Sequence, residues 1–271
     1  MGVVLEFLTQ LFDQGLSYSA INCARSALSQ FIIWKKHQAI GSHPWVIRFM
    51  KGVYNLRPPV PRYIDTWDVE ALLRVLRSLS PVSKLNLRNL TLKTVTLVAL
   101  VLAARSQTIT LLNLKNMTRR TSKYCFVIGA SELKQSRPGY TPPLIELKAY
   151  AVDKALCVYR ALDEYLSRTA ALRGSENSLF ISYVKPHGKV TSATIARWVK
   201  TMMARAGIDI TVYKAHSIRA ASSSRAWKAG EPLQEILATA GWSNKNTFAR
   251  YYNKKIRKPK QMAQKVLNTQ P

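Results

Sequence analysis

The sequence predicts a mainly α-helical protein with one small antiparallel β-sheet. Apolar residues recur mostly at helical spacing, which favours amphipathic helices over strands. Two short runs, Tyr124–Ile128 and Leu144–Leu147, have the composition of strands, and they flank the proline-containing segment ASELKQSRPGYTPP. This arrangement predicts a hairpin or a three-stranded sheet inside a helical fold.

The first 56 residues predict a small helical unit. Apolar stripes at helical spacing begin at Val4, continue over Leu28–Trp34 and end with Trp45–Val53. This unit is small for a complete domain, so the chain could begin inside it.

Residues 57–64 predict a stiff linker between two domains. Pro58, Pro59 and Pro61 cannot continue a helix, and each favours an extended conformation in the residue before it. A second, larger domain is therefore expected over residues 65–271.

Helices dominate the predicted second domain. Asp65 or Thr66 is expected to cap a first helix that ends at Leu79, before Ser80 and Pro81. The next helix, Leu87–Ala104, is apolar on most faces and should be buried, with Arg105 emerging at its end. Further helices or helical turns are expected at 109–117, 150–170, 192–206 (capped by Ser192), from His216, at 231–238, around Tyr251 and Tyr252, and at 261–267.

The charge of the chain points to a polyanionic partner. Its 271 residues include 41 Lys and Arg against 14 Asp and Glu, a formal net charge of +27. An anionic membrane surface is the rival partner, but the basic residues are spread along the chain and do not form a stripe on one helix. We therefore expect a nucleic acid and no membrane.

Other residue patterns exclude several classes of protein. The three cysteines and four histidines lack the spacing of metal ligands, and the cysteines suggest a reducing compartment. The longest apolar run, near 95–104, is too short to span a membrane. The opening segment has two acids and no basic start, so it does not fit a signal peptide.

His216 and Arg219 form a candidate clamp for a phosphodiester. Residues three apart on a helix point the same way, and arginine donates hydrogen bonds in a fork that matches a phosphate. A tyrosine follows in Tyr251 or Tyr252, whose phenolic oxygen could attack the phosphorus. Cleavage without a metal also needs cations on the non-bridging oxygens and a proton donor for the leaving oxygen.

Four local motifs in this order resemble the tyrosine recombinase/integrase family. These motifs are AARSQTITLLNL, SELKQSRPG, HSIR and AGWSNKNTFARYY. The separation of His216 and Trp242 is similar to that in Cre-like catalytic domains. RPPVPRYIDTWDVEALL and GWSNKNTFARYYNK further resemble recombinases of DIRS-type (tyrosine-recombinase) retrotransposons.

The resemblance implies a role for each candidate residue. Arg105 and Arg219 would grip the scissile phosphate, and Lys134 would protonate the leaving 5′ oxygen. His216 would hold or relay a proton near the nucleophile, and Trp242 would donate its indole N–H to a phosphate oxygen. One of Tyr251 and Tyr252 would form a 3′-phosphotyrosine. No metal or cofactor follows from this scheme.

The choice between the two tyrosines stays open, with a slight preference for Tyr252. The Cre-like spacing from Trp242 ends on Tyr251, whereas the DIRS-like pattern ends on Tyr252. Adjacent residues on a helix diverge by about 100°, so only one of them can face the phosphate unless the helix is irregular.

Each candidate also has a purely structural explanation. Arg105 could cap the C-terminal end of its helix, and Lys134 could be a solvated lysine in a turn. His216, Trp242 and the tyrosines could be core residues. The KKIRKPK segment could be a solvated tail, a phosphate-contacting arm or a nuclear localisation signal.

By resemblance, the chain is expected to be a site-specific DNA recombinase of a mobile element. A helical core-binding (SAM-like) domain, 1–56, would precede the catalytic domain, and the two would clamp duplex DNA. The resemblance also implies a tetrameric synapse, with 261–267 docking onto a neighbouring subunit, and a nuclear location. The alternatives are a domesticated DNA-binding protein with weak or no catalysis and a type IB-like topoisomerase.

Overall fold

The computed structural model describes residues 1–34, 38–60, 63–129, 144–242 and 245–257. It divides into two compact units, Met1–Arg62 and Tyr63–Pro271. Each unit has its own hydrophobic core, so each is described by itself.

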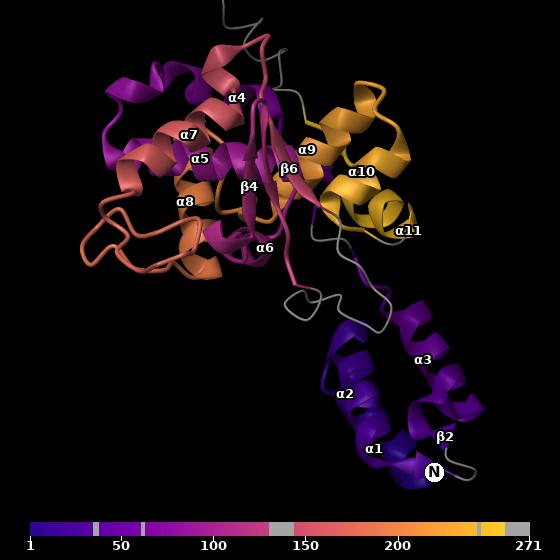
Figure 1. Cartoon of the computed structure of the whole chain (residues 1–271). Helices are drawn as coiled ribbons and strands as arrows, with labels where there is room; N and C mark the ends of the chain where they lie inside the picture. Colours follow the sequence, from indigo (N-terminus) through magenta and orange to yellow (C-terminus); the bar gives the residue numbers. More distant parts are fainter. Residues whose placement is uncertain (35–37, 61–62, 130–143, 243–244, 258–271) are drawn as a thin grey trace, which may run out of the picture. The chain divides into compact units, whose positions relative to one another are not determined.

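The first unit is a small helical bundle. Its helices are α1 (Gly2–Asp13), α2 (Tyr18–Phe31) and α3 (Pro44–Leu56), with a short antiparallel ribbon of β1 (Ile33–Trp34) and β2 (Gln38–Ala39) before the 3₁₀ turn η2 (Ile40–Ser42) (Figure 1). The core consists of Leu8, Ile21, Val46, Met50 and Val53. The helical stripe predicted over Leu28–Trp34 is wrong at its end, because α2 stops at Phe31 and the chain becomes extended.

The second unit contains most of the helices and the small sheet. In chain order its helices are α4 (Val69–Ser78), α5 (Leu87–Leu102), α6 (Ser106–Thr110), α7 (Val158–Thr169), α8 (Ser192–Arg205), α9 (Ser217–Lys228), α10 (Leu233–Ala240) and α11 (Lys245–Thr247). Its described connections include the 3₁₀ turns η3 (Val82–Lys84), η4 (Leu114–Asn116) and η6 (Lys154–Leu156).

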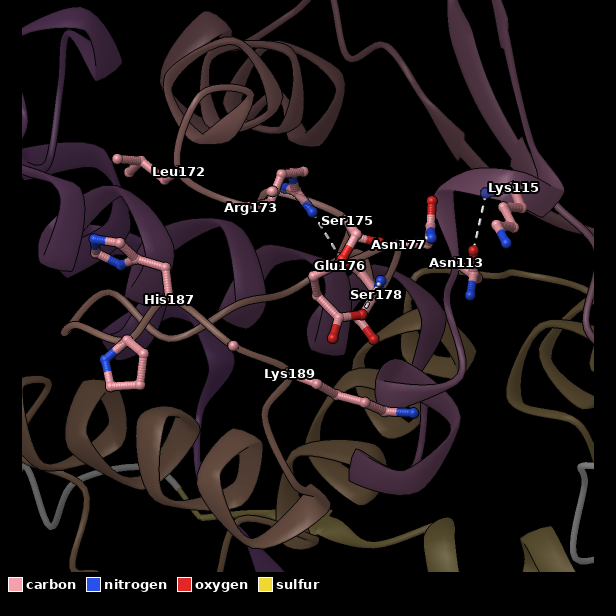
Figure 2. A pocket seen from close by; sticks show the side chains of 13 residues that line it. Asn113, Lys115, Leu172, Arg173, Ser175, Glu176, Asn177, Ser178, His187 and Lys189 are labelled. Carbon is pink, nitrogen blue, oxygen red and sulfur yellow. Dashed lines mark hydrogen bonds between the residues drawn. The ribbon is translucent and has the colours of Figure 1, made fainter.

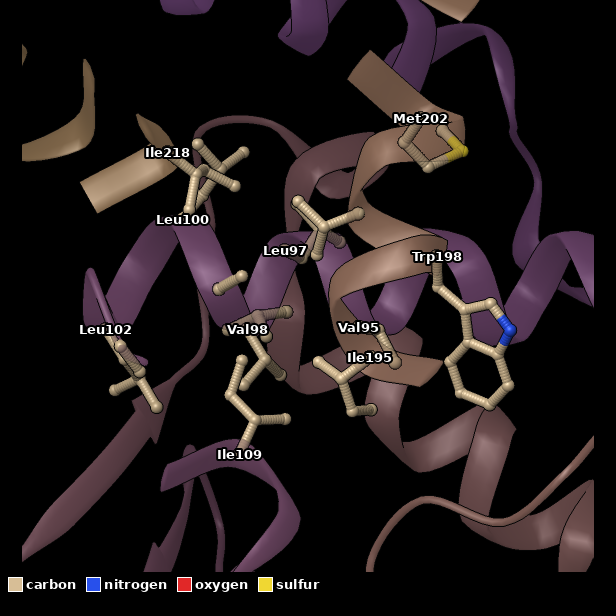
Figure 3. Close-up of a cluster of buried hydrophobic side chains, with 14 of the residues drawn as sticks. Val95, Leu97, Val98, Leu100, Leu102, Ile109, Ile195, Trp198, Met202 and Ile218 are labelled. Carbon is tan, nitrogen blue, oxygen red and sulfur yellow. The ribbon is translucent and has the colours of Figure 1, made fainter. Parts of the chain in front are cut away.

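Helix α5 is the centre of this unit, as its apolar sequence predicts. It contacts α7, α8 and α9, and residues on all its faces are buried. Figure 3 shows Val95 and Val98 of α5 near Ile195 of α8 and Ile109 of α6. Asn86 caps the first turn through its side chain, and Ala103 ends the helix in the left-handed conformation.

The predicted sheet is confirmed as a three-stranded antiparallel one. Its strands are β4 (Met117–Arg120), β5 (Lys123–Phe126) and β6 (Ile145–Lys148), in that order. The sequence did not predict β4, because its residues, Met-Thr-Arg-Arg, are mostly exposed and polar. Residues 130–143, which include Lys134, lie outside the described part of the chain.

A second, two-stranded pairing joins distant parts of the unit. β3 (Asp65–Thr66) runs parallel to β7 (Lys255–Ile256), which follows the two tyrosines. The expected capping by Asp65 or Thr66 is therefore wrong: those residues form β3, and the side chain of Asp68 caps α4.

The other helix boundaries depart from expectation by a few residues. A helical segment begins at Ser106 and not at 109, and α8 is capped by the Thr191 side chain, with Ser192 as its first helical residue. The helix expected at 150–170 is shorter, since it starts at Val158 after the η6 turn. Within the described ranges, no helix is long and apolar enough to cross a membrane.

Candidate active site

Helix α9 begins with the predicted phosphate clamp. His216 is the N-cap residue and is exposed, whereas Arg219, in the first turn, is only 1% exposed. A buried hydrogen bond holds the start of the helix in place: the indole Nε1 of Trp67 donates to the hydroxyl of Ser217 over 2.8 Å. Sequence analysis missed Trp67, since no local pattern indicates a contact across 150 positions.

Arg219 is a buried cation. Its Nη2 donates a 3.0 Å hydrogen bond to the carbonyl oxygen of Ala240, but its Nε is buried with no partner among the described residues. The pKa of Arg219 is lowered to about 10, mainly by burial and also by the charge of Arg105, while Tyr252 acts in the opposite direction. A buried guanidinium with an unused donor is suited to binding an anion.

Arg105 contributes a second positive charge. It lies two residues after the left-handed residue Ala103, is half-buried and is the N-cap residue of α6. It therefore does not occupy the last turn of α5, where a structural cap was the alternative explanation. Throughout the described ranges, no carboxylate forms an ion pair with Arg105 or Arg219, so both charges are available to a bound phosphate.

Trp242 lies directly after α10, which ends at Gly241 with φ of +65°, a conformation that favours glycine. Its ring is stacked on the ring of Tyr252, with centroids 4.2 Å apart, and lies 4.9 Å from the guanidinium carbon of Arg219. The indole Nε1 is buried and has no partner in the part of the chain that the structure describes. Trp242 thus packs the site and also offers a free donor.

The tyrosines lie in an irregular helix. Lys245–Thr247 is α-helical, and Phe248–Tyr252 continues as a π-helical turn, η7. Tyr252 is half-buried, and its phenolic oxygen is 3.0 Å from Nε2 of His216. Tyr251 is 43% exposed and stacks with its neighbour Arg250. The structure therefore brings Tyr252, and not Tyr251, to the other predicted residues.

Five of the seven candidates thus converge on one site. These are His216, Arg219, Trp242 and Tyr252, in direct contact, and Arg105, whose charge acts on Arg219. Tyr251 is exposed and stacks with Arg250, and Lys134 lies outside the described residues. Among the described residues, no group of three or more His, Cys, Asp or Glu side chains is placed to hold a metal ion.

Another hollow, of about 540 Å³, lies elsewhere in the second unit and contains none of the candidate residues. Figure 2 shows Lys115, Arg173, Glu176 and Lys189 around it. Its buried charge is already paired, because Arg173 donates to the carbonyl of Ser178 and Glu176 accepts from the amide of the same residue. Among the described residues that line this hollow, none has a buried side-chain donor without a partner, unlike Arg219 and Trp242 at the site on α9.

The family model described as "Phage integrase family" matches residues 62–257. The chain belongs to this family. The match covers the whole site, from before β3 to after β7, and it confirms the predicted membership of the tyrosine recombinases.

Solved structures with the same fold are integrases and recombinases. A XerH site-specific recombinase bound to a palindromic difH substrate has a TM-score of 0.62 and 18% identity, with 98% of this chain and 71% of that chain covered. A lambda integrase dimer bound to a COC′ core site has a TM-score of 0.57 and 14% identity, with coverages of 94% and 80%. The Tn1549 transposon integrase with transposon right end DNA has a TM-score of 0.58 and 14% identity, with coverages of 97% and 83%. No curated protein sequence matches the chain.

Proposed function

We propose that this phage integrase family member is a site-specific DNA recombinase in which Tyr252 is the nucleophile. The observation that supports this most is the contact between the phenolic oxygen of Tyr252 and Nε2 of His216. The contact lies beside two arginines without carboxylate partners within the described ranges, and a phosphodiester is the anion that this arrangement suits.

The proposed cleavage step follows from these positions. The phenolic oxygen of Tyr252 attacks the phosphorus and gives its proton to His216. The bond from phosphorus to the 5′ oxygen breaks, which leaves a 3′-phosphotyrosine and a 5′ hydroxyl. Arg105, Arg219 and the indole N–H of Trp242 stabilise the charge on the non-bridging oxygens. Lys134 remains the proposed donor to the 5′ oxygen.

Rejoining is the reverse reaction. A 5′ hydroxyl from the same or another strand attacks the phosphotyrosine, and Tyr252 leaves with a proton returned by His216. Because one phosphodiester is exchanged for another, the covalent intermediate conserves the energy needed for religation.

The biological setting is proposed from resemblance and charge. A net charge of +27 supports binding to double-stranded DNA. Integration of a DIRS-type or related mobile element, a nuclear location and a tetrameric synapse are parts of the same proposal. So is the assignment of the N-terminal helical unit as the core-binding domain. The proposed docking segment, 261–267, lies outside the described residues.

A suicide-substrate experiment tests the proposal. The protein is incubated with nicked duplexes from the ends of its element, and covalent adducts are separated on a denaturing gel. Wild type and Tyr251→Phe should form an adduct, and Tyr252→Phe should not. Loss of the adduct only in Tyr251→Phe would reassign the nucleophile. Binding without any adduct would favour a DNA-binding protein without catalysis, and plasmid relaxation without sequence preference would favour a type IB-like topoisomerase.

A further inference from the structure

A buried serine on α9 holds the chain directly after Tyr252. The hydroxyl of Ser224, which is fully buried, donates a 2.7 Å hydrogen bond to the carbonyl oxygen of Tyr252. The same hydroxyl accepts a 2.9 Å hydrogen bond from the amide of Lys254. One side chain thus binds the backbone on both sides of Asn253.

These two bonds lie where the helix of the tyrosines ends. The π-helical turn finishes at Tyr252, and the amide of Asn253 donates back to the carbonyl of Phe248 over 2.7 Å. Tyr252 is the last residue of this turn, so its carbonyl oxygen needs a hydrogen-bond donor from outside the helix. The Ser224 hydroxyl supplies this donor, and its oxygen also accepts a hydrogen bond from the Lys254 amide.

Ser224 belongs to the same helix as the clamp. His216 and Arg219 are at the start of α9, and Ser224 lies about two turns further along. A single helix therefore sets the position of the phosphate-binding guanidinium, of the imidazole and of the nucleophile's backbone. Stacking on Trp242 restrains the plane of the Tyr252 ring, but the serine fixes the chain from which the ring projects.

We propose that Ser224 is a positioning residue for strand cleavage, which holds the Tyr252 phenol in register with His216 and Arg219. This inference rests on the proposed function. Misplacement of a reacting group by about 1 Å can cost roughly 100-fold in rate, and loss of the Ser224 hydroxyl would leave both backbone groups without this partner.

The neighbouring Ser223 provides a matched control. It is also buried, at 1% exposure, but its hydroxyl donates to the carbonyl of Arg219 at 2.6 Å, with Ala220 at 3.5 Å, inside its own helix. Ser223→Ala and Ser224→Ala therefore remove the same atom from equally buried positions of one helix, and only the second change affects the Tyr252 segment.

The test measures single-turnover adduct formation at saturating nicked DNA, together with DNA affinity and the thermal midpoint. Ser224→Ala should cleave at least about 10-fold more slowly than wild type, with DNA affinity within about 2-fold. Ser223→Ala should stay within about 2-fold of wild type in both cleavage rate and DNA affinity. A general loss of folded protein would lower the final amount of adduct and the apparent affinity for DNA. Mispositioning of Tyr252 lowers only the rate constant of adduct formation.

A second variant keeps the test decisive if Ser224→Ala is poorly folded. Ser224→Cys keeps a side chain of similar shape with a weaker donor and acceptor, and its rate should fall between those of alanine and serine. Equal rates for wild type and both Ser224 variants would overturn the proposal, as would an equal slowing by Ser223→Ala. Absence of any wild-type adduct would instead reject the proposed function itself.

Discussion

Nε2 of His216 and the phenolic oxygen of Tyr252 are 3.0 Å apart, although 36 positions separate them in the chain. The ring centroids are 5.9 Å apart at 60°, an edge-on arrangement in which the imidazole meets the phenol through its nitrogen. Since this contact joins the start of α9 to the end of η7, it depends on the packing of α9, α10 and η7 around Trp242 and Phe248.

Replacing His216 should slow cleavage without weakening DNA binding. We expect His216→Ala to reduce the rate of adduct formation by about 100-fold or more, because the phenol loses its proton acceptor. The matched control is His187→Ala, which should leave the rate unchanged because the His187 ring lies outside the site and bonds to the carbonyl of Ser182, five positions earlier. The rate is measured on nicked DNA at saturating concentration; equal rates for the two variants would contradict the role of His216.

Trp242→Phe separates the two functions of the indole. Phenylalanine can still stack on Tyr252, but it lacks the buried Nε1 donor that has no partner in the described structure. Loss of one donor to a developing oxyanion costs roughly 100- to 1000-fold, so we expect a slower cleavage step with a small change in thermal midpoint. Trp198→Phe, in the core beside α5, should show the opposite: lower stability with a normal rate per folded molecule. If Trp242→Phe lowers only stability, the indole is a packing residue.

The sequence predicted which residues meet at this site better than it predicted their geometry. Periodicity was sufficient for α5, because a helix that is apolar on most faces can only be buried. Sequence patterns indicated only a slight preference for Tyr252 over Tyr251, because the π-helical turn that brings Tyr252 to His216 depends on bonds from the Asn253 amide to Phe248 and from Ser224 to Tyr252. The sequence also did not predict the β3–β7 pairing, because two-residue strands show no periodicity and their partners are distant in sequence.

Arg219 and Arg173 should respond differently to replacement by methionine. Arg173 is also buried, but its guanidinium donates to Ser178, Thr169 and Leu179, so it ties a loop to α7. Arg219 has one carbonyl acceptor, and its pKa, lowered to about 10, corresponds to a cost of about 3 kcal/mol for holding the charge at neutral pH. We expect Arg173→Met to lower the thermal midpoint by several degrees. Arg219→Met should keep or raise the midpoint and abolish the adduct. A large loss of stability in Arg219→Met would show that this arginine serves the fold.

Lys93 makes the stability of the second unit depend on pH. This residue of α5 is fully buried, and its Nζ donates to the carbonyl of Leu79 and, over 3.1 Å, to the hydroxyl of Ser80. Burial lowers its pKa from 10.5 to about 8, against a smaller opposing effect of Asp153. Between about pH 8 and 10.5 the unfolded chain therefore binds more protons at this site than the folded chain does.

The free energy of unfolding should consequently rise as the pH increases from about 8 to 10.5. Below about pH 8, Lys93 is charged in both states, so the folded protein bears the full cost of burying its ammonium group. The rise attributable to Lys93 should approach about 3 kcal/mol. Urea unfolding at pH 7, 8.5 and 10 measures it as the difference between wild type and Lys93→Met, which cancels the other titrating groups. Lys84→Met, at an exposed position of η3, should track wild type at every pH. A difference between wild type and Lys93→Met that stays constant from pH 7 to pH 10 would mean that Lys93 keeps an ordinary pKa in the folded protein.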